Sequence, residues 1–312
     1  MAAPLCIVGL GEAVYDVFPD KVVLGGTSLN VSVHAHQLLA PLGGRGVLLS
    51  RVGVDDLGRR LRDEFHSRQL PTEFIQSDPD KPTGKVIVQF RNGAPEYEIV
   101  VDSAWDNLTC GARELDLARS CSAVSFGSLS QRHPTARAAL RTFLSTAKSA
   151  TRIFDVNLRM DIYTAEMLDY GCSAAHWVKL NETELPVVSR LLGIAGNSTD
   201  ALATALRARY NLEAVIHTRG ERGTAAYISD GRIESEPVHY PSAPGADSVG
   251  AGDACCAGLL TGRLFGLNWP DIIHLANHLG AYVASQPSAT PPLPTPFHSF
   301  IRKLIEGGKP RV

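Results

Sequence analysis

One segment in the last third of the chain has the residue types needed to handle a phosphate group. DSVGAGD (247–253) precedes the small-residue stretch ACCAGLLTGRLFG, which predicts a helix. Glycines at a helix start let several backbone N–H groups converge on one point, and the helix dipole adds to their attraction for an anion. Asp253 could take a proton from a hydroxyl facing this nest, an arrangement that suits phosphoryl transfer. A glycine-rich turn with an aspartate that the dipole favours is the structural alternative.

A second glycine pair opens a predicted helix near the N-terminus. In GGTSLN (25–30), the glycines allow a ligand to approach the backbone, and Asn30 offers both a donor and an acceptor to neighbouring hydroxyls. Asp16 follows the first predicted strand and could accept hydrogen bonds from two sugar hydroxyls. An ordinary turn and a solvated loop aspartate are the alternatives for these two features.

Polar residues also follow three other predicted strands. DVNLR (155–159) places two polar groups and a cation at the end of one strand. Asn181 and Glu184 have the spacing of an N-cap and its capping-box partner, and equally of a carboxylate that holds Mg²⁺ through water. TRGERG (218–223) has glycines where the phosphates of a nucleotide could approach.

The elements that must position these residues alternate between strands and helices. Short apolar runs predict strands, and amphipathic stretches between them predict helices. This alternation predicts an α/β fold with a parallel sheet covered by helices on both faces, and with ligands at the carboxyl ends of its strands. The predicted strands are Leu5–Gly9, Gly46–Val52, Ala123–Gly127, Arg152–Val156, Trp177–Leu180 and Ala214–Thr218, and the helices include Asp55–Gln69, Thr135–Ser149, Thr183–Leu192 and Thr199–Tyr210.

One segment departs from this alternation. Gly84–Val101 reads as two strands around Asn92-Gly93, which favours a type I′ hairpin turn, and Val14–Leu24 reads as one extended stretch. Together they predict a small sheet that is either a lid or an edge hairpin. One hairpin face carries Val86, Val88 and Phe90, and a ribbon must cover such a face. Either Val14–Leu24 covers it or a second subunit's lid does, which predicts a homodimer; Lys85, Glu96 and Glu98 could instead protect an exposed edge in a monomer.

Composition restricts the class of protein. The chain has 312 residues, a net charge of −2 and 44% hydrophobic residues, enough for a substantial core. Its charges form no basic stripe and no apolar run reaches the ~20 residues of a membrane span, so we expect neither a nucleic-acid nor a membrane partner. Six scattered cysteines without a CxxC pair are typical of reduced thiols, and the N-terminus lacks the features of a signal peptide. We therefore expect a cytoplasmic protein.

These motifs, in this order, resemble the PfkB (ribokinase-like) family of carbohydrate kinases across essentially the whole chain. GGTSLN and DSVGAGD-ACCAGLL look like the two family signatures, and RVGVDDLG, KLNETE and HTRGERG resemble the landmarks between them. The resemblance implies one kinase domain over 1–312, folded as a three-layer α/β/α sandwich. It also implies a small antiparallel β-lid, formed by about 12–26 and 84–103, that closes over the sugar.

The resemblance also implies roles for single residues. The cofactors that it implies are ATP and Mg²⁺, and it implies a loop that can hold K⁺. The implied reaction transfers the γ-phosphoryl group of ATP to a hydroxyl of a sugar or nucleoside. The implied roles are a catalytic base (Asp253), an anion hole (Gly250, Ala251, Gly252), substrate-hydroxyl ligands (Asp16, Gly26, Asn30, with Arg159 beside them), Mg²⁺ and phosphate contacts (Asn181, Glu184), nucleotide contacts (Thr218, Gly220, Gly223, Asn277) and a K⁺ loop (Asp247, Val249).

Within the family, several segments most resemble fructokinases and therefore predict fructose 6-phosphate as the product. Ketodeoxygluconate kinases share the DxNxR element and are the nearest alternative; a catalytically silent sugar- or nucleotide-binding regulator is the alternative outside enzymes. Val156, Ser248 and Cys255 depart from the usual family residues without removing a catalytic group. The fructokinase-like segments are AWDNL (104–108), FGSLSQR (126–132), FDVNLR (154–159) and ANHLGAYVASQPSATPPLP (276–294).

Overall fold

A nine-stranded sheet forms the centre of the computed structural model, which describes residues 4–91 and 94–307. Its strands run in the order β13-β12-β11-β10-β9-β8-β1-β4-β5 and are parallel from β11 to β5. All six predicted strands are present; Ala123–Gly127 and Ala214–Thr218 have the predicted bounds, and no bound of the other four is shifted by more than one residue. The strands are β1 (Cys6–Leu10), β4 (Arg45–Gly53), β5 (Ile75–Asp78), β8 (Ala123–Gly127), β9 (Thr151–Asp155), β10 (Trp177–Asn181), β11 (Ala214–Thr218), β12 (Thr224–Ile228) and β13 (Gly231–Glu234).

The edge of this sheet differs from the parallel sheet expected from the alternation. β12 and β13 are antiparallel to their neighbours, because short turns join β11 to β12 and β12 to β13 instead of crossover helices. Gly223 and Gly231 lie at these two turns with φ of 74° and 117°, a backbone region that favours glycine.

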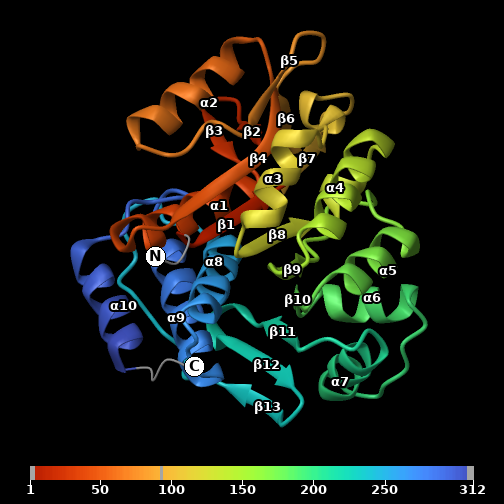
Figure 1. Ribbon diagram of the computed structural model, residues 1–312, viewed down its shortest axis with the longest axis vertical. Coiled ribbons are helices and arrows are strands. Elements are labelled where there is room, and N and C mark those ends of the chain that lie inside the picture. Colours follow the sequence, from red (N-terminus) through yellow and green to blue (C-terminus); the bar gives the residue numbers. More distant parts are fainter. Residues whose placement is uncertain (1–3, 92–93, 308–312) are drawn as a thin grey trace.

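Helices cover both faces of the central sheet (Figure 1). Successive strand residues point to opposite faces, so Ile7 packs in the core under one helix layer and Val8 in the core under the other. The first layer contains α1 (Thr27–Leu39), α8 (Ala251–Leu264), α9 (Trp269–Ala284) and α10 (Thr295–Gly307); the second contains α3 (Ala112–Ser120), α4 (Pro134–Thr146), α5 (Ala165–Ala174), α6 (Glu184–Leu191) and α7 (Thr199–Arg209). The predicted α/β/α sandwich is confirmed.

The remaining helices are α2 and four short 3-10 turns. Among the described residues, none of the helices combines the length and the apolar character needed to cross a bilayer. The bounds are α2 (Asp56–Ser67), η1 (Ala40–Leu42), η2 (Ala104–Asn107), η3 (Leu129–Gln131) and η4 (Gly220–Arg222).

A second, four-stranded sheet stands beside the carboxyl ends of the central strands (Figure 1). We call it the lid sheet; it contains β2 (Val14–Val17), β3 (Val22–Gly25), β6 (Gly84–Arg91) and β7 (Ala94–Ile99) in the order β3-β2-β6-β7. Each hairpin is antiparallel, but β2 and β6 pair in parallel, which the long connection between them allows.

The prediction of one extended stretch over Val14–Leu24 is wrong. The chain reverses after β2, where the Phe18 N–H donates to the Lys21 carbonyl at 2.9 Å and closes a turn through Pro19-Asp20. Proline and aspartate are turn formers, and this signal was overlooked. Asn92 and Gly93 lie outside the described residues, so the predicted type I′ turn is not tested.

The apolar face of the β6–β7 hairpin is covered within the same chain. Val88 and Ile99 are buried, and Ile99 packs with Val14, Trp105 and Leu129. The cover comes from Trp105 of η2 and Leu129 of η3. The predicted cover by the Val14–Leu24 segment is wrong, because β2 pairs with β6 in the same sheet and contributes Val14 to the same apolar face. The side chain of Phe90 lies outside the described residues.

Candidate active site

Two cavities meet at the N-terminus of α8. One, of about 720 Å³, lies under the lid sheet, and we call it the lid cavity. The other, of about 530 Å³, lies against α9, and we call it the α9 cavity. Four residues line both cavities: Asn181, Thr218, Ser248 and Gly252. The start of α8 is therefore where a group bound on one side can reach a group bound on the other.

The lid cavity brings together most of the residues predicted to bind or activate a substrate. Asn30 Nδ2 donates to Asp253 Oδ2 at 2.7 Å, which joins the GGTSLN and DSVGAGD motifs. The buried Asn30 Oδ1 has no hydrogen-bond partner in residues 4–91 and 94–307. A buried carbonyl oxygen left in this way favours a ligand that brings its own hydroxyl donor. Predicted residues that line this cavity are Asp16, Gly26, Asn30, Arg159, Asn181, Glu184, Thr218, Val249, Gly250, Gly252 and Asp253.

The surroundings of Asp253 give it an unusual affinity for protons. Removal from water, reinforced by the negative charge of Asp155, raises the pKa of the Asp253 carboxyl to about 7, although Asn30, Lys179 and Arg159 oppose the shift. Asp155 is itself paired with Lys179, whose Nζ lies 2.9 and 2.8 Å from its two carboxylate oxygens. A carboxyl that titrates near neutral pH can exchange a proton with a hydroxyl at that pH.

Backbone geometry explains the glycines at the start of both α1 and α8. Gly250, the N-cap of α8, has a φ of 80°, and a Cβ there would lie 2.4 Å from the Ala289 carbonyl oxygen. Gly26, the N-cap of α1, has a φ of 110°, and a Cβ there would lie 2.9 Å from the Glu12 carbonyl oxygen. Both sites therefore require glycine, and both helices begin at the lid cavity.

Two acidic residues flank the entry to α1. Asp16 lies on β2 and lines the lid cavity, where loss of water raises the pKa of its carboxyl and Arg159 opposes that rise. Glu12, which the sequence analysis missed, is buried in the same cavity and accepts hydrogen bonds from Thr27 N–H at 3.1 Å and Ser130 Oγ at 2.7 Å. Its position directly after β1, at the carboxyl edge of the sheet, was the available signal.

A second missed residue is Lys179. It is a buried cation on β10 that lines the lid cavity and contacts Asp155. A lysine within an apolar strand was the signal, since such a residue is almost never buried without a partner.

Asn181 and Glu184 form the capping arrangement that was one of their two interpretations. Asn181 Oδ1 accepts from the N–H groups of Thr183 and Glu184, and Glu184 Oε2 accepts from the Asn181 N–H at 2.8 Å. Glu184 Oε1 accepts from the Leu158 N–H at 2.8 Å, and burial raises the pKa of its carboxyl. Thr183, directly before α6, makes no side-chain capping bond, so Asn181 supplies the cap.

The predicted nucleotide residues gather in the α9 cavity. Asn181, Thr218, Gly220, Gly223 and Asn277 all line it. A Cβ on Gly223 would lie 2.9 Å from Asn277 Nδ2, so the loop after β11 touches α9 closely at this point. The cavity has the size of an ordinary small-molecule site.

The remaining predicted residues divide between the two cavities. Ala251 and Asp247 line the α9 cavity, whereas Val249 lines the lid cavity. Asp247 Oδ1 accepts the Val249 N–H at 2.9 Å. Within the described chain, no group of three or more His, Cys, Asp or Glu side chains has the geometry of a metal site.

Comparison with known proteins decides the family. Residues 10–296 match the family described as pfkB family carbohydrate kinase. The chain belongs to the PfkB family. This PfkB kinase is therefore a sugar phosphotransferase, and the predicted family is confirmed.

The curated relatives of the PfkB kinase include bacterial fructokinases. It is 28% identical to the fructokinase of Klebsiella pneumoniae, over 81% of this chain and 82% of that one. It is also 28% identical to the fructokinase of Escherichia coli, over 91% of this chain and 95% of that one.

Solved structures share the fold. The ATP-bound fructokinase of Xylella fastidiosa matches with a TM-score of 0.79 at 21% identity, over 97% of this chain and 98% of that one. The aminoimidazole riboside kinase of Salmonella enterica matches with a TM-score of 0.75 at 24% identity, over 96% and 99%. Proteins named for different acceptors thus share this fold, so the fold does not specify the acceptor.

Proposed function

We propose that this PfkB kinase transfers the γ-phosphoryl group of ATP to a primary hydroxyl of fructose. The observation that carries the proposal is the position of Asp253, which stands at the start of α8 where the two cavities meet and is held there by Asn30. The lid cavity then takes the sugar and the α9 cavity takes ATP.

Asp253 acts as the general base in this proposal. It removes the proton of the attacking hydroxyl, and Asn30 keeps its carboxylate aimed at the cavity. The backbone N–H groups of Gly250, Ala251 and Gly252, at the positive end of α8, stabilise the charge that develops on the transferred phosphoryl group.

Four residues of the lid cavity select the sugar in this proposal. Asp16 and Asn30 accept hydrogen bonds from sugar hydroxyls, Gly26 allows the ring to approach the backbone, and Arg159 stands at the exposed side of the cavity. Buried polar atoms that need a hydroxyl partner discriminate strongly against ligands that lack one.

The proposed nucleotide site consists of Asn181, Thr218, Gly220, Gly223 and Asn277. Glu184 fits a role in holding Mg²⁺ through water, because it is a hard oxygen donor beside the junction of the cavities and Mg²⁺ usually keeps several waters. When bound, Mg²⁺ neutralises charge on the ATP phosphates. The loop with Asp247 and Val249 carries a carboxylate that suits K⁺.

Fructose is proposed as the acceptor because the fructokinases of Klebsiella pneumoniae and Escherichia coli match along most of this chain. A ketodeoxygluconate kinase, another sugar or nucleoside kinase, and a silent ligand-binding regulator remain the alternatives. The intact pairing of Asn30 with Asp253 favours a catalyst over the regulator.

A coupled ADP-release assay tests the proposal over fructose, ketodeoxygluconate, ribose, tagatose and adenosine. We expect fructose to give the highest kcat/KM. A tenfold higher value for another acceptor would overturn the fructose assignment and leave the kinase assignment standing. Absence of acceptor-dependent ADP release over the whole panel would instead favour the regulator.

We further propose a homodimer formed through the lid sheet. β7 is one of the two edge strands of that sheet, and an edge strand can pair with the same strand of a second copy. Sedimentation velocity at micromolar concentration should show a dimer, and a monomer would contradict the proposal. The single domain and the cytoplasmic location expected from the sequence stay predictions.

A further inference from the structure

Two of the fructokinase-like segments meet behind the lid cavity. AWDNL supplies Trp105 and Asp106 from η2, and FGSLSQR supplies Leu129 from η3 and Arg132 directly after it. Of these four residues, only Leu129 lines the lid cavity. The other three therefore act on any bound sugar only through what they hold in place.

Arg132 and Asp106 form a buried, two-pronged ion pair. Arg132 Nε and Nη2 lie 2.7 Å from the two carboxylate oxygens of Asp106, and the two side chains are only 8% and 3% exposed. Nη2 also donates to the Val100 carbonyl at 2.8 Å, just beyond the end of β7. One guanidinium therefore joins η3, η2 and the end of the lid hairpin, a task that a lysine cannot reproduce.

Trp105 lies between this ion pair and the lid cavity. The guanidinium carbon of Arg132 is 4.0 Å from the centre of the Trp105 ring. On another side, a Cβ added to Gly84 at the start of β6 would lie 2.7 Å from the ring. Trp105 also packs with Val14, Ile99 and Leu129, all of which line the lid cavity. The ring is therefore the support of the apolar wall of that cavity.

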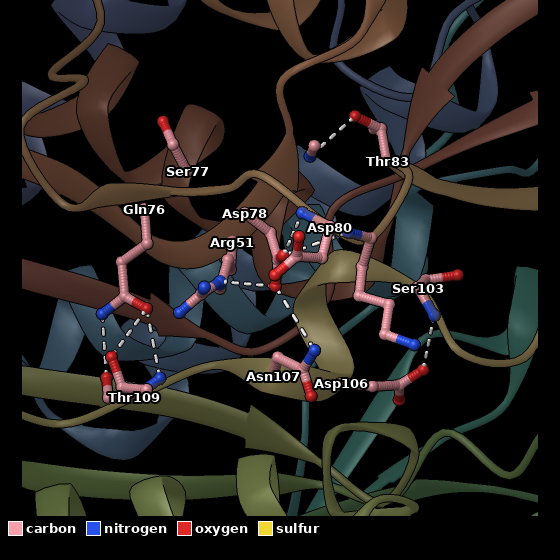
Figure 2. A network of polar contacts seen from close by, with 12 residues as sticks. Arg51, Gln76, Ser77, Asp78, Asp80, Thr83, Ser103, Asp106, Asn107 and Thr109 are labelled. Carbon is pink, nitrogen blue, oxygen red and sulfur yellow. Dashed lines mark hydrogen bonds and ion pairs between the residues drawn. The ribbon is translucent and has the colours of Figure 1, made fainter.

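The surroundings of this support are fixed by further polar contacts, shown in Figure 2. Asp78 at the end of β5 pairs with Arg51 of β4 at 2.9 Å and accepts from Asn107 of η2 at 3.3 Å. Ser103 N–H donates to Asp106 at 3.0 Å. The Gly53 N–H at the end of β4 donates to the Thr83 hydroxyl at 3.0 Å. Both ends of the β6–β7 hairpin are thereby tied to the central sheet.

We propose that Arg132 is a positioning residue for the acceptor. Its guanidinium, paired with Asp106, presses Trp105 against the base of β6 and so fixes the apolar wall formed by Val14, Ile99 and Leu129. The wall sets where the sugar ring rests, and hence where its hydroxyl stands relative to Asp253. This inference rests on the proposed use of the lid cavity as the acceptor site.

Arg132→Lys is the first test, because it keeps the charge opposite Asp106 but loses the fork and the flat stacking surface. With the acceptor that the wild type phosphorylates best, the KM for the acceptor should rise about tenfold, since small displacements of a reacting group have large effects. The KM for ATP should stay within about twofold, and kcat should fall less than the acceptor KM rises.

Gly84→Ala is the second test and leaves the ion pair untouched. Its methyl group would meet Trp105 and the Val14 side chain, at 2.7 and 2.9 Å, and displace the same wall from the other side. We expect the same split between acceptor and ATP KM values. Because the contact that the two variants share is Trp105, a common phenotype identifies the wall that Trp105 supports as the cause.

Arg152→Lys is the matched control. Arg152 is a half-buried arginine near the amino end of β9, and it bonds the Ala174 and Ala147 carbonyls far from either cavity. The Arg152→Lys substitution should lower the melting temperature but leave the KM values for the acceptor and for ATP unchanged. If Arg132→Lys and Gly84→Ala also lower only the melting temperature, or raise both KM values equally, Arg132 is merely structural and the inference is wrong.

A failure of the role inferred for Arg132 can be told apart from a failure of the proposed fructose kinase activity. If fructose proves a poor acceptor, the same comparison is made with whichever sugar is used, and the predicted KM split is unchanged. If no acceptor is turned over, calorimetric binding of fructose and of ATP to the same variants replaces the KM values. Unaltered fructose affinity in both variants would then overturn the inference.

Discussion

The lid cavity and the α9 cavity share the start of α8 but are built differently. Ionisable side chains concentrate in the lid cavity, where Glu12, Asp16, Asp155, Lys179, Glu184 and Asp253 all contribute to the lining. The α9 cavity is lined largely by small residues and exposed backbone, among them Gly220, Gly223, Gly252, Ala276 and Gly280. Charge and hydrogen bonding therefore dominate on one side of α8, and shape dominates on the other.

This difference follows from what each side must do. An attacking hydroxyl must be selected, oriented and deprotonated, which requires side chains with defined protonation. A nucleotide presents phosphates that backbone N–H groups bind and a flat base that needs close approach. Side-chain truncation should therefore affect the lid cavity most, whereas added bulk should affect the α9 cavity most.

The largest expected effect comes from Asp253→Asn. Asparagine has the same shape but cannot accept the proton, so kcat should fall by about 10²–10⁴, while ATP still binds. Asp271→Asn is the matched control, since Asp271 occupies the same third position of α9, one helix away from the site. A variant with more than half of the wild-type kcat would refute the base assignment.

Removal of the hydroxyl acceptors should come next in size. In Asn30→Ala and Asp16→Ala, a sugar hydroxyl loses its partner at a cost of ~1–3 kcal/mol, so the sugar KM should rise roughly ten- to a hundredfold. Steady-state kinetics with each substrate varied in turn will measure this. Equal increases in the KM for ATP would show that the two cavities are not functionally separate.

The pH dependence should report the raised pKa of Asp253. Below about pH 7 the carboxyl is protonated, so kcat/KM for the sugar should fall about tenfold per pH unit. A higher pH, which should increase activity, should lower stability. The folded state binds the Asp253 proton more tightly than the unfolded state does. The free energy of unfolding should therefore fall as pH rises from about 4 to 7. Asp253→Asn should therefore melt higher than the wild type at pH 8. A lower melting temperature there would contradict the assigned environment.

A smaller effect, on the KM for ATP, is expected when a side chain is added in the α9 cavity. Gly223→Ala places a side chain at a φ of 74°, next to Asn277, at a cost of about 1 kcal/mol or more. The KM for ATP should rise roughly fivefold with the sugar KM unchanged. Gly193→Ala, at a φ of 64° with open space around it, controls for backbone strain alone.

The sequence predicted the central sheet and the site motifs well because their signals are local. Buried parallel strands are short apolar runs, and the helix starts at Gly26 and Gly250 carry their glycines in the motif itself. The turn at Pro19-Asp20 and the strands β12 and β13 were overlooked. β13 is short and largely exposed, and β12 is buried but contains two alanines, which favour a strand only weakly.

Contacts between distant segments could not be predicted in this way. The Arg132–Asp106 pair joins residues from two separate segments, and only the folded chain brings the guanidinium onto Trp105. The same holds for Lys179 beside Asp155, which sit on neighbouring strands. Pairing across strands depends on register, which local patterns do not fix.

The central claim is that a phosphoryl group crosses from ATP to a sugar hydroxyl at the start of α8. Phosphorus-31 NMR of a reaction containing fructose, ATP and Mg²⁺ tests it most directly, in the wild type and in Asp253→Asn. The account predicts a sugar monophosphate signal in the wild type and almost none in the variant, although calorimetry shows both substrates still bound. Inorganic phosphate as the wild-type product, or an equal sugar phosphate signal in the variant, would contradict it.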